Sequence, residues 1–377
     1  MPDVLIYADT ARSPEMRHEV PVTVPDPFLY AERDGERHTT VTAFEIDRIK
    51  EVAPDIQTHP LEEFGFDDLV AKMPREEADL EVYRRSVDKF GISKAVVPPG
   101  FPVELADALR EHGLELSSDR DFFVSRRRVK NEAELEGIRR ASRAAEAGMR
   151  AVREMLDSAE ATNGTLTLEG EPLTCERLKL AVERAFSEHG AAAEDFIVSH
   201  GAQTAIGHEM GSGPVAPGEP VVADLFPRDR ETACYTDMTR TFVAGDVPDE
   251  LGEYQKLCRQ ALEQVVEEIK PGVTGRRLFE ITCELFQEHG YPTQLSKKPG
   301  EVLEEGFFHG LGHGVGLEVH EQPWLGRGPG ELVAGDVIAV EPGLYRQGFG
   351  GCRLEDLVLV TADGAEILTD FPYDLSS

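Results

Sequence analysis

The sequence contains 377 residues, and 71 acidic against 39 basic side chains give it a formal net charge of -32 at pH 7. This charge repels nucleic acid and anionic membranes, so both are excluded as partners. A chain of this length usually forms two domains, and a hydrophobic content of 40% excludes a protein that is disordered throughout.

The acidity also predicts the surroundings of the protein. Mutual repulsion of so many carboxylates weakens a compact state unless salt screens it, so we expect a halophilic protein whose melting temperature rises with added KCl. The first residues lack the basic and apolar pattern of a secretion signal, and no run approaches the roughly 18 apolar residues that span a bilayer. A cytoplasmic protein is therefore expected. The five cysteines lack CxxC spacing, so they predict buried free thiols rather than a disulfide framework or a zinc site.

Residues 1–127 are predicted to form an accessory α/β domain. Short apolar runs such as residues 4–7 and 95–97 alternate there with helical stretches such as residues 104–112. This part of the sequence contains no cluster of histidines, cysteines or paired carboxylates that looks like a site, so the chemistry is expected elsewhere.

A long amphipathic helix is predicted to open the second domain, residues 128–377. Asn131 and Glu134 have the spacing of a capping box. Apolar residues such as Ile138 and Met149 follow at helical spacing. The change from short alternating elements to one long helix places the boundary between the domains just before it.

The second domain contains an internal repeat. The segment LTCERLKLAVERAFSEHG, which begins at Leu173, matches VTGRRLFEITCELFQEHG, which begins at Val273, and every match keeps the same offset of 100 residues. Each copy predicts a helix that ends at its last glycine, a residue suited to the left-handed conformation after a helix. A duplicated fold with two similar halves is therefore expected.

Each copy of the repeat is followed by strand-like sequence that carries two acids. Asp224 and Asp237 follow the first copy, and Glu341 and Glu355 follow the second. Burying an acid in an apolar strand is costly unless a cation or hydrogen bonds compensate for it, and two neighbouring cations need carboxylates that bridge them. Because duplicated halves can face each other across a pseudo-twofold axis, the four carboxylates are predicted to form one site for two cations. A duplication kept only for folding does not explain the matching acids.

Three histidines, His309, His313 and His320, lie in the glycine-rich segment FHGLGHGVGLEVHE. Glycine-rich runs also occur in nucleotide-binding loops, but no helix plainly opens on this one. Imidazole is a good ligand for transition metals, so the segment favours metal binding.

Five motifs together resemble the Xaa-Pro peptidase family, which includes prolidase and aminopeptidase P. They are GHEM around His208, DMTRTF from Asp237, HGLGHGVGLEVHE, EPG at Glu341 and RLED at Glu355, in the order typical of that family. The resemblance covers the whole second domain. It implies an α/β protein with a pseudo-twofold pita-bread catalytic domain, a small creatinase-like N-terminal domain and assembly as a homodimer.

The resemblance also implies the roles of individual residues. The implied ligands of two divalent ions, which are manganese, cobalt, zinc or iron, are Asp224, Asp237, His313, Glu341 and Glu355. The implied catalytic residues are Glu341, His208, His309, His320 and Arg353. Among these, the acid is the proton shuttle, the histidines orient the substrate and stabilise the transition state, and the arginine supports a neighbouring carboxylate.

The implied activity is hydrolysis of the peptide bond before proline by a hydroxide that bridges two metal ions. The substrate is a proline-containing peptide, and the enzyme is a metallopeptidase of the Xaa-Pro dipeptidase or aminopeptidase P type. The sequence leaves that choice and the physiological metal open. Two alternatives remain: a hydrolase of another small amide on the same scaffold, and a binding protein without activity. Creatinases and such binding proteins tend to lack metal ligands that this sequence keeps.

The segment DLFPRD, residues 224–229, departs from the family pattern. A bulky residue follows Asp224 and an apparent insertion lengthens the hairpin, so the size of the substrate is left open. His200 is also unusual, and the sequence supports a contact with substrate and a position in a surface loop about equally.

Overall fold

The computed structural model describes residues 2–376, and the chain divides into two compact units, residues 1–127 and 128–377. Each unit buries its own hydrophobic clusters. All five cysteines are buried free thiols, as predicted. Within the described residues, no helix has both the length and the apolar composition that crossing a bilayer requires.

The first unit is built on a mixed six-stranded sheet with the strand order β4-β3-β2-β1-β5-β6. Its helices and strands are, in chain order, β1 (Val4–Ala8), α1 (Pro14–Glu19), β2 (Phe28–Arg33), β3 (Glu36–Val41), α2 (Ile46–Val52), β4 (Ile56–Pro60), α3 (Phe66–Val70), α4 (Arg75–Phe90), β5 (Lys94–Val97), α5 (Val103–Glu111), β6 (Glu115–Ser118) and α6 (Arg120–Arg128). Strands β1, β2 and β3 are antiparallel neighbours, whereas β4, β5 and β6 each pair with a parallel neighbour. The alternation of short strands and helices that the sequence predicts is confirmed in this unit.

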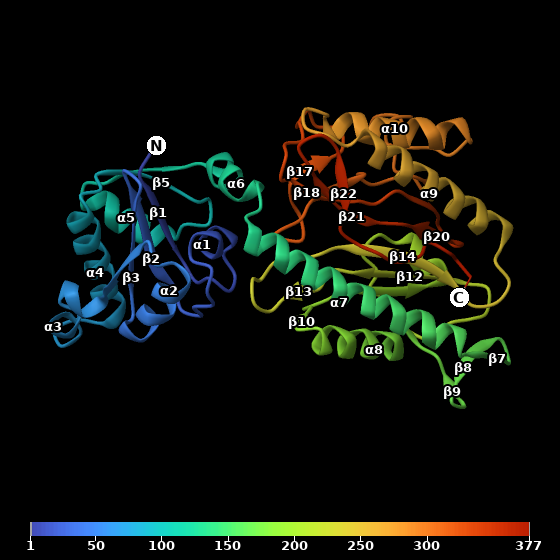
Figure 1. Cartoon of the computed structure of the whole chain (residues 1–377), viewed down its shortest axis with the longest axis horizontal. Helices are drawn as coiled ribbons and strands as arrows, with labels where there is room; N and C mark the ends of the chain where they lie inside the picture. Colours follow the sequence, from blue (N-terminus) through green and yellow to red (C-terminus); the bar gives the residue numbers. More distant parts are fainter. Residues whose placement is uncertain (1, 377) are drawn as a thin grey trace. The chain divides into compact units, whose positions relative to one another are not determined.

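Helices cover both faces of this sheet (Figure 1). In β1, Leu5 packs with residues of α4 and α5, whereas Val4 and Ile6 pack with residues of α1 and α2. Successive side chains of a strand point to opposite faces, so a strand that is covered on both sides must be apolar throughout. This explains why the run VLIYA in β1 contains no charged residue.

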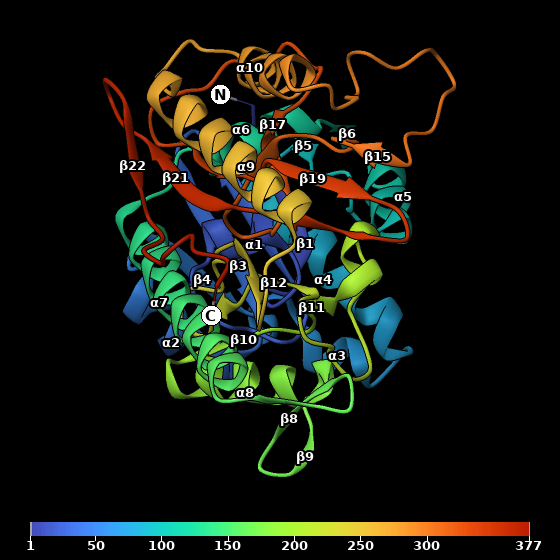
Figure 2. The same ribbon diagram turned by 90° about the vertical axis from the view of Figure 1, so that its right-hand side faces the viewer.

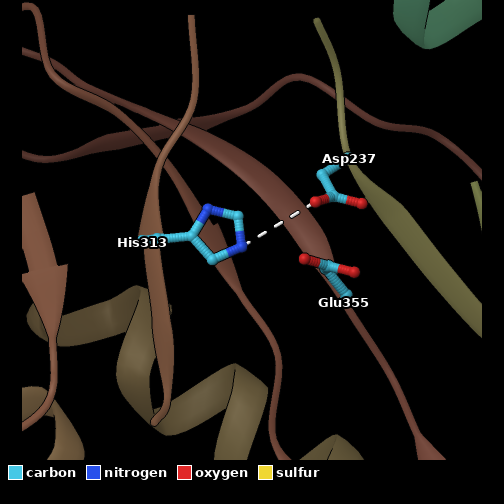
Figure 3. Close-up of side chains that lie close together, drawn as sticks. All are labelled: Asp237, His313 and Glu355. Atoms are coloured by element: carbon cyan, nitrogen blue, oxygen red, sulfur yellow. Dashed lines mark ion pairs between the residues drawn. The ribbon is translucent and has the colours of Figure 1, made fainter. Parts of the chain in front are cut away.

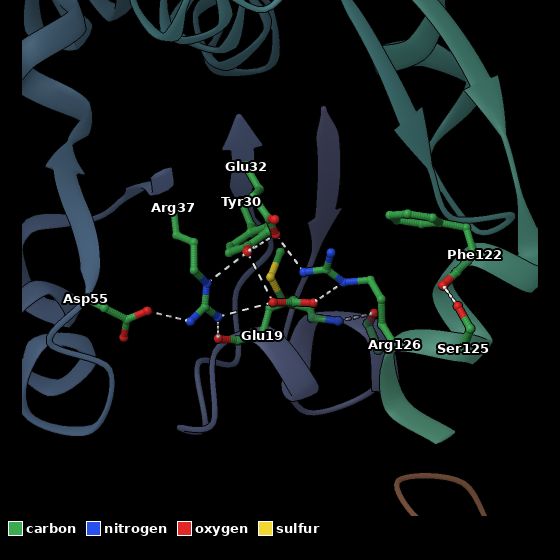
Figure 4. A network of polar contacts seen from close by, with 10 residues as sticks. Glu19, Tyr30, Glu32, Arg37, Asp55, Phe122, Ser125 and Arg126 are labelled. Carbon is green, nitrogen blue, oxygen red and sulfur yellow. Dashed lines mark hydrogen bonds and ion pairs between the residues drawn. The ribbon is translucent and has the colours of Figure 1, made fainter. Parts of the chain in front are cut away.

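A largely buried network of charges ties α6 to the rest of the first unit (Figure 4). Arg126 donates hydrogen bonds from Nε to Glu19 (2.7 Å) and from Nη2 to Glu32 (2.6 Å). Arg37 pairs with the other oxygen of Glu19 at 3.1 Å, and the Tyr30 hydroxyl lies 3.1 Å from both carboxylates. Burial raises the pKa of Glu19, but the hydrogen bond and the charge of Arg126 outweigh it and lower the pKa below its ordinary value. Arg126 therefore anchors the end of the first unit.

The second unit consists of two halves with helices outside and strands inside. Its elements are, in chain order, α7 (Glu132–Asp157), β7 (Glu160–Thr162), β8 (Thr165–Leu168), β9 (Glu171–Pro172), α8 (Cys175–Glu188), β10 (Ala191–Ala192), β11 (Ile197–His200), β12 (Pro220–Leu225), β13 (Arg228–Asp229), β14 (Met238–Val243), α9 (Asp249–Glu268), α10 (Gly275–Glu288), β15 (Glu305–Gly306), β16 (Gly312–Gly314), β17 (Glu321–Leu325), β18 (Val337–Val340), β19 (Gly343–Arg346), β20 (Gly350–Arg353), β21 (Asp356–Val360) and β22 (Ala365–Ile367). The first half has the sheet β11-β12-β14, and the second half has the sheets β17-β16-β18-β21-β22 and β15-β19-β20. Helices α7 and α8 lie on one side of the strands, and α9 and α10 lie on the other (Figure 1, Figure 2).

Helix α7 begins as the sequence predicts. The side chain of Asn131 accepts a hydrogen bond from the Glu134 amide, and the Glu134 carboxylate accepts one from the Asn131 amide, each at 2.9 Å. This capping box satisfies two backbone donors near the first turn, where helices leave amides without intrahelical partners. Ile138 and Met149 are fully buried, so the predicted apolar face is confirmed.

The two copies of the repeat form the equivalent helices α8 and α10. Thr174 and Thr274 cap them through hydroxyl groups that accept hydrogen bonds from the amides three residues on. Gly190 and Gly290 follow the two helices with φ angles of 72° and 88°, in the left-handed region. The helix ends predicted from the repeat are therefore confirmed.

Candidate metal centre

The second unit contains a cavity of about 290 Å³ that both halves line. All nine residues singled out in the sequence for metal or substrate binding line it, and they are Asp224, Asp237, His313, Glu341, Glu355, His208, His309, His320 and Arg353. The side chains that complete the lining are apolar and belong to Ile197, Met210, Phe226, Phe308 and Val319. The structure thus brings the residues from separate stretches of sequence into one pocket.

The four acids lie at the ends of the central strands of the two halves. Asp224 is the fifth residue of β12, and Asp237 immediately precedes β14, the antiparallel neighbour of β12. Glu341 immediately follows β18, and Glu355 immediately precedes β21, which is the antiparallel neighbour of β18. Each half therefore contributes one acid pair from two adjacent strands, as the repeat predicts.

Asp237, His313 and Glu355 point toward one another (Figure 3). One candidate ligand atom from each residue lies within 4.8 Å of the other two. Asp237 belongs to the first half, whereas His313, at the centre of β16, and Glu355 belong to the second. The three residues are only 4%, 5% and 2% exposed, so a cation held here is shielded from water.

His313 presents one ring nitrogen to the acids. Its Nδ1 donates to the carbonyl oxygen of Gly314 at 3.1 Å, which leaves the lone pair on Nε2. That nitrogen lies 3.8 Å from Oδ2 of Asp237 and 3.9 Å from Oε1 of Glu341. Burial and, next, the neighbouring His320 lower the pKa of His313 to about 4. At neutral pH the ring is therefore uncharged, which is the form that binds a metal ion.

The acids carry more negative charge than the surrounding side chains compensate. Oδ1 of Asp237 is buried and has no hydrogen-bond partner among the described residues. Burial raises the pKa of Asp237 well above its ordinary value, and the charges of Glu355 and Asp224 raise it further. Burial also raises the pKa of Glu355, and it raises that of Glu341 to about 7. Uncompensated buried carboxylates are costly, so this set of carboxylate oxygens and one imidazole fits divalent transition metals.

Asp224 is held by a chain of hydrogen bonds that ends at His309. Arg353 donates from Nη2 to Oδ2 of Asp224 at 2.6 Å and from Nη1 to the hydroxyl oxygen of Tyr345 at 3.2 Å. That hydroxyl donates to Nε2 of His309 at 2.9 Å, because Nδ1 of the same ring donates to a backbone carbonyl at 2.7 Å. Tyr345 was not singled out in the sequence. The only signal was its place in EPGLY, four residues after Glu341.

Thr239 connects the two halves beside Glu355. Its hydroxyl donates to Oε2 of Glu355 at 2.6 Å, and the Glu355 amide donates to the Thr239 carbonyl at 3.1 Å. Alternation along the strand predicts that Thr239 shares a side with Asp237 and that Arg240 faces the other way. Arg240 does so, and it pairs with Asp356 at 2.8 Å. The sequence thus predicted the side of Thr239 but not its partner.

The histidines other than His313 differ in position. His208 and His320 are exposed and line the cavity, and the ring of His320 packs edge-on against that of His313 with a centroid separation of 4.3 Å. His200 does not line the cavity, and its Nδ1 pairs with Glu219 at 2.8 Å. His200 is the last residue of β11 and is partly buried, so it lies neither in the cavity lining nor in the surface loop that the sequence left open.

The segment that departs from the family pattern, residues 224–229, lines the cavity through Asp224 and Phe226. Farther along, Arg228 and Asp229 form β13, which pairs with β10. Asp229 accepts two hydrogen bonds from Arg140 of α7, at 3.0 and 2.9 Å. This part of the segment is therefore fixed to the scaffold, and Phe226 is the residue of the segment beyond Asp224 that lines the cavity.

The first unit contains a larger cavity, of about 360 Å³. Its polar lining includes Arg75, Asp79, Tyr7 and Tyr83, but no histidine or cysteine lines it. Among the described residues, the one group of three candidate metal ligands lies in the second unit. The candidate site is therefore identified by the metal-binding residues that line its cavity, and not by the volume of that cavity.

Comparison with known proteins connects this geometry to a family. Residues 136–362 match the model of the metallopeptidase family M24. An Xaa-Pro dipeptidase of Pyrococcus furiosus is 31% identical over 324 residues, which are 82% of this chain and 84% of the relative.

Solved structures share the whole fold. The prolidase of Pyrococcus horikoshii OT3 has a TM-score of 0.78 at 25% identity and covers 100% of this chain and 95% of its own. An X-Pro aminopeptidase of Thermotoga maritima MSB8 has a TM-score of 0.79 at 23% identity over 99% and 97% of the two chains. The predicted α/β fold, with an N-terminal domain before a pita-bread domain, is confirmed.

Proposed function

The chain belongs to the metallopeptidase family M24, and we propose that it is a two-metal hydrolase that cleaves the peptide bond before proline. The substrate class is supported by relatives that are named Xaa-Pro dipeptidase and prolidase. The observation that carries the proposal is the convergence of all five candidate metal ligands on one cavity.

The proposed ligands of the two ions are Asp224, Asp237, His313, Glu341 and Glu355. Manganese, cobalt, zinc or iron suits a set of carboxylates with one imidazole. When bound, the ions would polarise the scissile carbonyl group and supply a nucleophile near neutral pH. Arg353 orients the carboxylate of Asp224 through its 2.6 Å hydrogen bond.

Glu341 is the proposed proton carrier. Its Oε1 lies 3.9 Å from Nε2 of His313, and its Oε2 lies 3.8 Å from Nδ1 of His309. The carboxylate therefore faces a proposed metal ligand on one side and a proposed substrate-binding residue on the other. From there it takes a proton from the attacking water and delivers it to the proline nitrogen, which leaves as a secondary amine.

The apolar part of the cavity suits a proline ring. Because the nitrogen of a proline amide carries no hydrogen, the bond before proline brings no unpaired donor into an apolar pocket. Phe226 and Phe308 are the two phenylalanines of the lining. His208, His309 and His320 are proposed to orient the peptide and to stabilise the oxygen that becomes negative in the transition state.

The assembly and surroundings of the enzyme are also proposals. We propose a homodimer in the cytoplasm of a salt-rich cell, supported by the family resemblance and by the net charge of -32. Residues 1–127 are assigned an accessory role, and residues 128–377 are assigned the catalysis. Light scattering across a range of KCl concentrations tests the dimer.

Hydrolysis of Ala-Pro, Ala-Pro-Ala and Ala-Ala by the metal-loaded enzyme in high salt tests the reaction. We expect cleavage before proline and none of Ala-Ala, because the apolar lining leaves the extra N–H of Ala-Ala unpaired. The preferred peptide of the first two decides between a dipeptidase and an aminopeptidase. Equal cleavage of Ala-Ala contradicts the proline specificity.

Measurement of metal content in the same preparation separates the alternatives. About two ions per chain without turnover of any of the three peptides would support the binding protein or a hydrolase of another small amide. The complete set of candidate ligands in the cavity disfavours both.

A further inference from the structure

Two basic side chains at the start of the second unit reach two strands of the candidate metal centre. Nζ of Lys130 lies 2.5 Å from Oε1 of Glu321, and these side chains are only 2% and 3% exposed. Arg128 donates from Nε and Nη2 to the two oxygens of Asp336, at 2.7 and 2.8 Å, and the Asp336 side chain is fully buried. These two ion pairs form a linker clamp.

The linker clamp holds both neighbours of the strand that carries His313. Strand β16 lies between β17 and β18 in the five-stranded sheet. Glu321 is the first residue of β17, and Asp336 immediately precedes β18. Lys130 and Arg128 therefore hold the starts of the two flanking strands, and His313 lies at the centre of the strand between them.

The pairing around His313 is short and irregular. Strand β16 has three residues, and its register with β17 shifts between His313 and Gly314. Such an irregularity disrupts the ladder locally. At Gly316, a Cβ atom would lie 2.7 Å from Oε1 of Glu321 and 2.8 Å from Cε of Lys130. The loop after β16 thus leaves room for the ion pair and is packed around it.

The other end of the linker belongs to the half that carries Asp237. The capping box at Asn131 joins the backbone next to Lys130 to the start of α7. Helix α7 then packs into the core of the first half through residues such as Met149. The linker clamp therefore connects the helix of one half to the strands of the other, across the site where Nε2 of His313 lies 3.8 Å from Oδ2 of Asp237.

We propose that Lys130 is a positioning residue for the candidate metal centre. By holding the start of β17, it keeps His313 within reach of Asp237 and keeps His320, which directly precedes Glu321, beside it. The inference rests on the proposed function for its catalytic readout, whereas local order and metal affinity can be measured without catalysis.

Three variants of the full-length protein and one matched control test the proposal. Lys130→Met keeps a long side chain but removes the charge, and Lys130→Arg restores the charge. The double variant Lys130→Met with Glu321→Gln avoids leaving a buried carboxylate without a cation, so it separates positioning from stability. Arg126→Met is the control, because it removes a cation four residues away whose partners lie in the first unit.

Hydrogen exchange of the metal-free protein, metal affinity and the hydrolysis of Ala-Pro-Ala are then compared. For Lys130→Met and for the double variant we expect faster exchange in residues 312–325, and a loss of about 10- to 100-fold in metal affinity, as is common when a group that orients a ligand is removed. At saturating metal, kcat should fall by a similar factor, because His313 and the neighbouring His320 are no longer held in place. Lys130→Arg should recover most of each loss, and Arg126→Met should show none of them.

Two results overturn the proposal. The first is that the double variant keeps wild-type exchange, affinity and kcat, even if its melting temperature falls, because the ion pair then contributes only stability. The second is that Arg126→Met produces the same losses as Lys130→Met, because the effect is then not local. If the wild type cleaves no proline peptide, the proposed function fails. Hydrogen exchange and metal affinity then still test whether the linker clamp holds His313 in position.

Discussion

Replacing Tyr345 by phenylalanine removes one hydroxyl group from the chain of hydrogen bonds between Arg353 and His309. That hydroxyl accepts from Arg353 at 3.2 Å and donates to His309 at 2.9 Å. Tyr345 is 1% exposed, so water does not easily replace the lost partner. The change leaves the aromatic ring, and therefore the packing, in place.

The expected magnitude follows from the groups left without partners. An unsatisfied buried acceptor or donor costs about 1–3 kcal/mol. Arg353 keeps its bond to Asp224, so the larger loss falls on His309, whose ring keeps its hydrogen bond to the Gly310 carbonyl but loses the one at Nε2. If that cost is felt in the transition state, kcat for Ala-Pro-Ala falls about 5- to 150-fold, because each 1.4 kcal/mol is about a factor of ten.

Steady-state kinetics and thermal unfolding of Tyr345→Phe check this expectation. Tyr254→Phe is a matched control, because Tyr254 is also buried and its hydroxyl donates to Glu250 at 2.7 Å, but it does not line the cavity. The control should lose a similar amount of stability and keep its kcat. A kcat for Tyr345→Phe within twofold of the wild type would refute the reasoning.

Three further predictions concern the metals, pH and salt. His313→Ala and Glu341→Ala should each abolish hydrolysis, and calorimetric titration of His313→Ala should show weakened metal binding; full activity in either variant contradicts the assignment. Burial raises the pKa of Glu341 from 4.5 to about 7 in the metal-free protein, so between these values the folded state keeps a proton that the unfolded state has released. The melting temperature of the metal-free protein should therefore fall, relative to the metal-loaded protein, as pH rises from about 4.5 to about 7, and parallel pH profiles would argue against it. The melting temperature should rise with added KCl because salt screens the net charge of -32, and a constant value would count against that effect.

Much of the site could be predicted from the sequence because it depends on short-range chemistry. The capping box at Asn131 and the helix ends at Gly190 and Gly290 follow from the needs of a few neighbouring backbone groups. Acids such as Asp224 and Glu341 stand out because an acid beside an apolar strand is costly without compensation. Their duplication and motif order then predicted that they meet, and they line one cavity.

Which groups touch one another was decided only by the tertiary structure. Thr239 and Glu355 are 116 residues apart, and Lys130 and Glu321 are 191 residues apart. Sequence periodicity reports which face of a helix or strand a residue occupies, but not the register of the partner, and a shift of one residue reverses the face. Partners at such separations are selected by how the two halves pack. The residue types of the candidate metal ligands could therefore be predicted from the sequence. The contacts that hold these residues in place were determined by the tertiary fold.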